Sequence, residues 1–262
     1  MTEHTTRRTT DEPAAGHAAD PTSGRATGRA TGPATGPATG EVTGEVTGLA
    51  FTPATGRFAP VRLYDPLIAL TRERLWRGLL AMHAAPRPGD VIVDVGTGTG
   101  SLALLLNRVE PRARVVAVDP DREVLALARR KAKAAGADVE WRVGMGDALA
   151  DVLDPGSADT VVSGLVLHQC PLAVKRSVLA SMSEALRPGG RLVIADFGLQ
   201  RTPLMRLAFR IVQLADGKED TQPNADGVLP GLISEAGFRD VREAEVVSTV
   251  NGSISVLVAR RG

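Results

Sequence analysis

Residues 91–100, V-I-V-D-V-G-T-G-T-G, decide the fold of this chain. The first half is a short β-branched apolar run containing one acid, a pattern typical of a parallel strand buried on both faces. The three glycines, spaced by two, allow a tight turn and a close approach of the backbone to a ligand. Because a helix is predicted to open at Ser101, the turn lies at the positive end of that helix, which favours a nucleotide-binding cradle.

Four further apolar runs follow this first strand along the chain. They predict strands at 114–119, 139–143, around 159–163 and at 191–196, with a loop of sequence R-P-G-G just before the last one. Strands that alternate with helices are typical of an α/β protein with a doubly wound, mostly parallel sheet.

The carboxyl end breaks this alternation. Residues 229–237 read as a helix closed by glycine. Residues 241–247 and 254–259 read as two strands joined at Asn251-Gly252, a strong turn pair. The expected fold is therefore a doubly wound α/β sheet of seven strands, mostly parallel, that ends in an antiparallel hairpin.

The glycine spacing separates two classes of nucleotide-binding protein. Dinucleotide enzymes carry G-x-G-x-x-G and would need glycine or alanine at 101, where this chain has serine. The turn, the Gly146-Asp147-Ala148 after the third strand and the L-R-P-G-G-R-L run at 186–192 resemble instead the class I S-adenosylmethionine-dependent methyltransferases, broadly the ubiquinone/menaquinone C-methyltransferase-like group. The resemblance covers roughly residues 63–262, and Thr99 stands where members of the narrower group carry an acid.

This resemblance implies S-adenosyl-L-methionine as the cofactor. Asp119, at the end of the second strand, would accept hydrogen bonds from the ribose diol, and Asp147 would accept one from the adenine amine. The residues expected to hold the cofactor are Asp94, Gly96, Thr97, Gly98, Gly100, Asp119, Pro120, Asp147, Ala148 and Ser163. The implied function is transfer of a methyl group to O, N or C of a small-molecule acceptor that is aromatic, lipid-like or a secondary metabolite.

The methyl acceptor is expected beyond the carboxyl ends of the strands. His168, after the fourth strand, is either a general base or a residue that orients the next helix, predicted at 173–186. Asp196, at the end of the fifth strand, either orients the acceptor or bonds the neighbouring loop. Cys170 is expected to be a small buried apolar residue, and the spacing of Cys and His predicts no metal site.

A helix is predicted at 203–215, and it is a second segment that could line the acceptor pocket. A polar, turn-rich loop is predicted after it, at 217–227. The helix is either a lid over the acceptor or simply packed on its own domain. The lid candidates are Tyr64, Arg206, Phe209 and Arg210, with Arg62 and Asp65 beside the tyrosine.

Residues 1–56 are predicted to be a disordered low-complexity tail, and residues 57–262 the methyltransferase domain. The tail repeats a tetrapeptide: R-A-T-G, P-A-T-G and E-V-T-G each occur twice in succession. Such a segment lacks the large apolar side chains that offset the entropy of ordering a chain. Its four arginines and six acids also argue against a transit peptide.

The charge balance and the cysteine content limit the kinds of partner and the compartment that we expect for this protein. The chain has 31 basic and 30 acidic residues, so no electrostatic footprint for nucleic acid is present. One cysteine and no long apolar run predict a cytoplasmic protein without a membrane span. The expected partner is the small-molecule acceptor, and the protein is expected to be a monomer or homodimer.

Two alternatives to this enzyme remain open from the residues. The first is a regulatory or scaffolding module that binds the cofactor without catalysis. The second is a nucleic-acid methyltransferase, disfavoured because S-G-L-V at 163–166 replaces the Asn/Asp-Pro-Pro-aromatic motif of amino-directed members.

Overall fold

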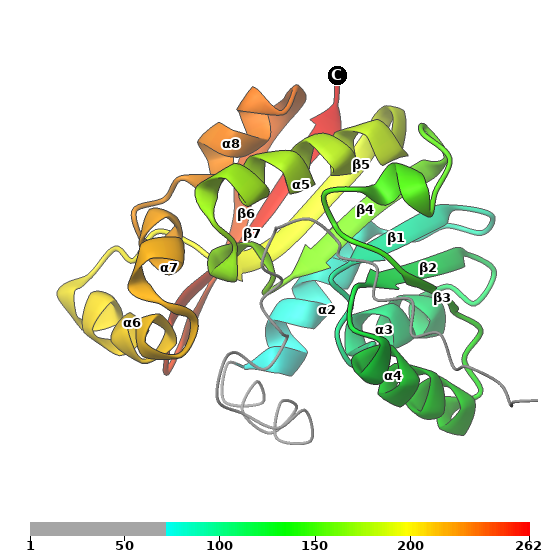
Figure 1. Cartoon of the computed structure of the whole chain (residues 1–262), viewed down its shortest axis with the longest axis horizontal. Helices are drawn as coiled ribbons and strands as arrows, with labels where there is room; N and C mark the ends of the chain where they lie inside the picture. The colour runs from blue at the N-terminus through cyan, green and yellow to red at the C-terminus, as the bar shows by residue number, and fades with distance from the viewer. Residues whose placement is uncertain (1–71) are drawn as a thin grey trace, which may run out of the picture. The chain divides into compact units, whose positions relative to one another are not determined.

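The computed structural model describes residues 72–262, so the predicted tail and Tyr64 lie outside the described residues. The described part is built on one seven-stranded sheet with the strand order β3-β2-β1-β4-β5-β7-β6 (Figure 1). Its strands are β1 (Val91–Val95), β2 (Arg114–Asp119), β3 (Glu140–Val143), β4 (Ala158–Gly164), β5 (Leu186–Phe197), β6 (Phe238–Thr249) and β7 (Gly252–Arg261). The first five pair in parallel, whereas β7 runs antiparallel to both β5 and β6, which confirms the predicted fold class.

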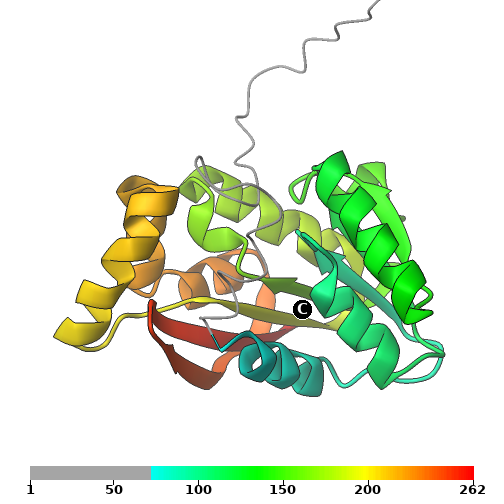
Figure 2. The same ribbon diagram turned by 90° about the horizontal axis from the view of Figure 1, so that it is seen from below.

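Helices cover both faces of the sheet (Figure 2). The α-helices are α2 (Glu73–Ala84), α3 (Ser101–Val109), α4 (Arg122–Ala135), α5 (Leu172–Ala185), α6 (Pro203–Asp216), α7 (Lys218–Ala225) and α8 (Leu229–Glu235). Short 3₁₀ turns, η2 (Leu149–Asp151) and η3 (Leu167–Gln169), follow β3 and β4. Trp76 and Leu80 of α2 pack with α3 against one face, while α5 and α8 cover the other through Leu179 and Leu232. None of the helices described in residues 72–262 combines the length and apolarity needed to cross a bilayer.

The start of β5 differs from the loop predicted at 187–190. The strand begins at Leu186, and its register with β4 moves from Ala158 opposite Leu186 to Thr160 opposite Arg191. The sheet therefore absorbs the R-P-G-G segment as an irregularity within β5, with the segment's first three residues exposed.

The predicted loop at 217–227 is wrong, because residues Lys218–Ala225 form helix α7. Two of its polar side chains, Thr221 and Asn224, are fully buried, whereas Lys218 and Glu219 are exposed. The Thr221 hydroxyl donates to the carbonyl of Gly217 at 2.6 Å, and the Asn224 amide donates to the carbonyl of Phe197 at 2.9 Å. A tertiary hydrogen bond to β5 and a local one at its start thus stabilise a helix that turn-rich composition does not predict.

Candidate active site

The glycine turn after β1 has a backbone conformation that residues other than glycine adopt only with strain. Gly96, Gly98 and Gly100 have φ values of +70°, +55° and +78°, in the left-handed region that favours glycine. A β-carbon at Gly96 would overlap Val166, and one at Gly100 would lie 2.5 Å from the Trp141 ring. The turn is therefore packed closely between Val166 and Trp141, and its backbone, without side chains at the three glycines, precedes α3 as a candidate ligand-binding cradle.

Two buried side chains fix the strand side of this cradle. Asp94 is only 1% exposed, and its Oδ2 accepts a hydrogen bond of 2.6 Å from the Thr97 hydroxyl. Burial raises the pKa of Asp94 to about 6. Ser163, at the same edge of β4, donates its hydroxyl to the Val95 carbonyl at 2.8 Å. The predicted cofactor residues of β1 and β4 therefore lie together.

Asp119 brings the end of β2 to the same place. Its Oδ2 accepts the N–H of Gly98 at 2.8 Å, and its Oδ1 accepts the N–H of Asp121 at 3.0 Å. Each carboxylate oxygen can accept two hydrogen bonds, so both retain acceptor capacity for a ligand. Burial raises the pKa of this carboxyl. Pro120, the next residue along, is half-buried.

Asp147 and Ala148 lie between β3 and η2 and are half-buried. The Ala148 N–H donates to the Met145 carbonyl at 3.2 Å, so it closes a local turn. The adenine contact expected of these two residues stays a prediction.

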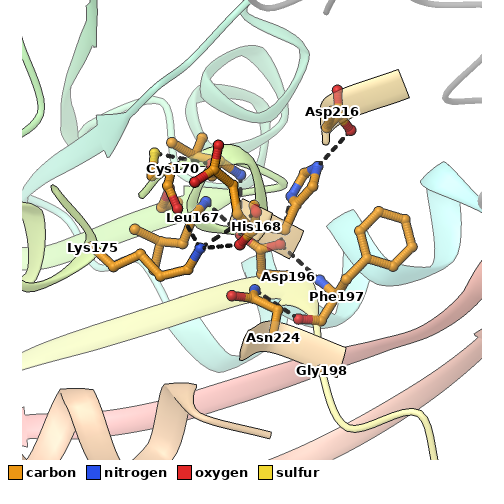
Figure 3. A network of polar contacts seen from close by, with 12 residues as sticks. Leu167, His168, Cys170, Lys175, Asp196, Phe197, Gly198, Asp216 and Asn224 are labelled. Carbon is orange, nitrogen blue, oxygen red and sulfur yellow. Dashed lines mark hydrogen bonds and ion pairs between the residues drawn. The ribbon is translucent and has the colours of Figure 1, made fainter. Parts of the chain in front are cut away.

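One carboxylate organises the edge of the sheet beyond β4 and β5, where the acceptor is expected. Asp196 is 1% exposed at the end of β5. Its Oδ2 accepts backbone N–H bonds from Val166, Leu167 and His168, with the Leu167 bond at 2.7 Å. Its Oδ1 accepts the N–H of Phe197 at 2.7 Å and contacts Nδ1 of His168 at 2.7 Å (Figure 3). Asp196 therefore fixes the whole loop that carries the histidine.

His168 joins two carboxylates. Its Nε2 lies 3.5 Å from Oδ2 of Asp216, the last residue of α6, so both ring nitrogens face an acid (Figure 3). Burial alone lowers the pKa of His168, but the charges and hydrogen bonds of Asp196 and Asp216 outweigh it and raise the pKa to about 9. At neutral pH the ring is therefore a buried imidazolium, with Phe197 packed edge-on at 5.0 Å.

A second buried cation secures α7. Lys175 on α5 is fully buried, and its Nζ donates to the carbonyls of Asp220 at 2.8 Å, of Cys170 at 2.5 Å and of His168 at 3.4 Å. Burial lowers the pKa of this lysine. Neither Lys175 nor Asp216 was predicted from the sequence, because their partners lie 45 and 48 residues away in the chain.

The predicted lid residues of α6 differ in their exposure: Phe209 is buried, whereas the two arginines are exposed. Phe209 is 1% exposed, and its ring centroid lies 5.2 Å from that of Phe197, so it packs α6 against the core; its contact with an acceptor stays a prediction. Arg206 and Arg210 are exposed, and Arg206 Nε donates to the Gln200 carbonyl at 3.0 Å.

Cys170 is partly buried, and burial raises the pKa of its thiol to about 11, so the residue is a protonated, unreactive thiol at neutral pH. Within residues 72–262, no three His, Cys, Asp or Glu side chains are grouped as metal ligands.

Comparison with known proteins agrees with this geometry. The family model described as a methyltransferase domain matches residues 92–190. The demethylmenaquinone methyltransferase of Thermus thermophilus is 35% identical over 152 residues, which are 57% of this chain and 66% of that protein. The ubiquinone/menaquinone biosynthesis C-methyltransferase UbiE of Syntrophotalea carbinolica is 28% identical over 218 residues, 76% of this chain and 90% of that protein.

A solved structure supports the same fold. The magnesium protoporphyrin IX methyltransferase of Synechocystis PCC 6803, with bound S-adenosylhomocysteine, aligns with a TM-score of 0.58 at 18% identity, over 80% of this chain and 91% of that one. The strand order, the glycine cradle, the matched family model and the quinone methyltransferase relatives agree with one another. The chain belongs to the class I S-adenosylmethionine-dependent methyltransferase family.

Proposed function

We propose that this protein transfers the methyl group of S-adenosylmethionine to a small-molecule acceptor with a quinone-related aromatic ring. The observation that carries the proposal is the relationship to UbiE, which extends over 90% of that protein and so includes the acceptor side as well as the cradle. A further relative acts, by its name, on a 2-phytyl-1,4-naphthoquinone.

The residues of the cradle suit this cofactor. Asp119 is a buried carboxylate with unused acceptor capacity beside a bare glycine backbone, which is what a ribose diol requires. When bound, S-adenosylmethionine supplies a methyl group on a positively charged sulfur that leaves readily. The other residues that we propose to hold it are Asp94, Gly96, Thr97, Gly98, Gly100, Pro120, Asp147, Ala148 and Ser163.

We propose a positioning role for His168 rather than the role of general base. A base must be neutral before it can accept a proton, and a pKa near 9 leaves little neutral ring at physiological pH. Asp196 is engaged by four backbone N–H groups and the imidazole, so it also supports the site rather than touching the acceptor. The two residues together set the position of the loop after β4 and of α6.

The experiment is methyl transfer by the purified full-length chain with S-adenosylmethionine and a panel of acceptors. We expect a product one methyl group heavier, detected by mass spectrometry, from the reduced form of a 2-alkyl-1,4-naphthoquinone. Asp119→Ala is the control, because it should lose the product through lost cofactor binding. Tight cofactor binding with no methylated product from any acceptor, including a nucleic-acid arm, would favour the non-catalytic module instead.

A pH profile separates the two readings of His168. If His168 were the base, kcat would rise with a pKa near 9 and His168→Gln would abolish that limb. A positioning role predicts that His168→Gln raises KM for the acceptor and leaves the shape of the kcat profile unchanged.

A further inference from the structure

Helix α6 carries large aliphatic side chains on the side that faces away from its own domain. Leu204, Leu207, Ile211 and Leu214 are 75%, 59%, 60% and 84% exposed. Their spacing of three, four and three residues places them on one side of the helix, and we call this set the α6 apolar face. Both views show α6 at the outer end of the described domain, with α7 on its inner side (Figures 1 and 2).

Packing among the residues that the structure describes, 72–262, does not explain this face. The inner side of α6 already contributes Phe209 and Val212 to the core, and it is tied to β7 through a contact between Met205 and Ser253. A helix that only covers its own domain normally presents polar residues outward. Four adjacent aliphatic side chains left in water carry a substantial free-energy cost, which a covering partner would remove.

The charges beside the apolar face are basic. Arg206 and Arg210 lie four residues apart along one flank and are exposed. The one acid of α6, Asp216, points inward to His168 instead. An aliphatic face flanked by arginines is the pattern of a helix that lies in the interface of a membrane with anionic lipids.

We propose that the α6 apolar face docks this protein on the surface of an anionic lipid bilayer. The four aliphatic side chains enter the headgroup and acyl boundary, and Arg206 and Arg210 contact lipid phosphates. A second copy of the chain fits the face less well, because a stable protein interface uses about 20–30 residues on each side and this face offers four large ones.

The position of the helix connects docking to the proposed activity. The carboxyl end of α6 contacts His168 through Asp216, so the docked helix borders the acceptor edge. An acceptor with a long apolar tail could then pass from the bilayer to the site without crossing bulk water. This connection rests on the proposed function, whereas the docking itself does not.

The test is sedimentation of the full-length chain with vesicles of phosphatidylcholine alone and of phosphatidylcholine mixed with phosphatidylglycerol. We expect binding to the anionic vesicles that weakens with salt, and a loss of about tenfold or more in the double variant Leu207→Gln/Ile211→Gln. The matched control is Met82→Gln/Val109→Gln, which removes two exposed apolar side chains from other helices and should bind as the unaltered protein does. Thermal unfolding followed by circular dichroism verifies that both double variants remain folded.

The outcomes that overturn the proposal are distinct. Absence of binding to anionic vesicles, or equal binding by the α6 double variant, refutes docking through this face. A dimer in analytical ultracentrifugation that the α6 double variant dissociates assigns the face to a second copy. Methyl transfer to a tailless, water-soluble naphthoquinol should be equal in the α6 double variant and the unaltered protein, so loss of docking is distinguishable from failure of the proposed function.

Discussion

The buried imidazolium of His168 makes the stability of this protein depend on pH in a predictable direction. Its pKa in the folded protein is about 9, against an ordinary value of 6.5. A group whose pKa is raised by folding contributes stability that is complete below its unfolded pKa and is lost as the pH rises through its folded pKa. The stabilising contribution of His168 should therefore be present at pH 6.5 and disappear above pH 9.

The two pKa values set the size of the effect. They differ by about 2.5, and one pKa unit corresponds to 1.36 kcal/mol, so the contribution is about 3 kcal/mol of unfolding free energy. The sources of this energy are Asp196 on β5 and Asp216 on α6. Burial raises the pKa of the Cys170 thiol to about 11 and lowers the pKa of Lys175, so both residues must be kept unchanged in the proteins that are compared.

The assay is urea unfolding of the unaltered protein and of His168→Gln at several pH values. The difference in unfolding free energy between the two proteins should be largest near pH 6.5 and should shrink by about 3 kcal/mol by about pH 10. Lys175 and Cys170 are present in both proteins and cancel in this difference. A difference that stays constant with pH, or an NMR titration of the His168 ring with a midpoint below 7, would refute the reasoning.

Three further predictions concern the cradle and α7. Asp119→Asn should weaken S-adenosylmethionine binding about tenfold or more in calorimetry, and unchanged affinity would contradict the ribose contact. Gly100→Ala should lower the unfolding free energy by about 1–3 kcal/mol more than Gly136→Ala. Both glycines have positive φ, but only at Gly100 would the added β-carbon collide with the Trp141 ring. Equal losses in urea unfolding would contradict the tight packing of the turn. Lys175→Met should speed hydrogen exchange of the α7 amides while α8 amides, as the internal control, keep their rates; unchanged α7 rates would show that the lysine does not hold the helix.

The elements around the cradle could be predicted because their signals are local. The apolar run and the glycines at 91–100 specify strand, turn and helix start within ten residues, and the structure has β1 and α3 at the predicted positions. Strand β2 also has its predicted bounds, which places Asp119 at its end beside Gly98. The carboxyl-terminal hairpin was also predicted, but its turn is shifted by one residue: Val250 and Asn251 connect β6 to β7, and Gly252 already pairs with Thr249.

The acceptor side could not be predicted in this way, because its structure depends on contacts between distant segments. Residues 218–225 look like a loop by composition, and they become α7 through the Asn224 bond to β5 and the Lys175 bond to the Asp220 carbonyl. The sequence predicts His168 and Asp196 as site residues, but nothing in it indicates that Asp216 is the second carboxylate that contacts His168. The ordinary pKa of histidine suggests a base, whereas the contacts with Asp196 and, to a smaller extent, with Asp216 raise the pKa to about 9 and make the ring a structural cation.

The same contacts imply that the donor and acceptor sides are mechanically joined. Asp196 binds the backbone immediately after β4, whose Ser163 is bonded to the end of β1 at the cradle. From that loop, His168 reaches Asp216 on α6 by an ion pair. A displacement of α6 must therefore break a charged contact in a buried site, where the loss is large because water cannot replace it. Docking or acceptor binding that moves α6 would accordingly move the loop after β4 through the ion pair between His168 and Asp216. His168→Gln removes this ion pair, so it should abolish the coupling between α6 and that loop while leaving the glycine turn intact.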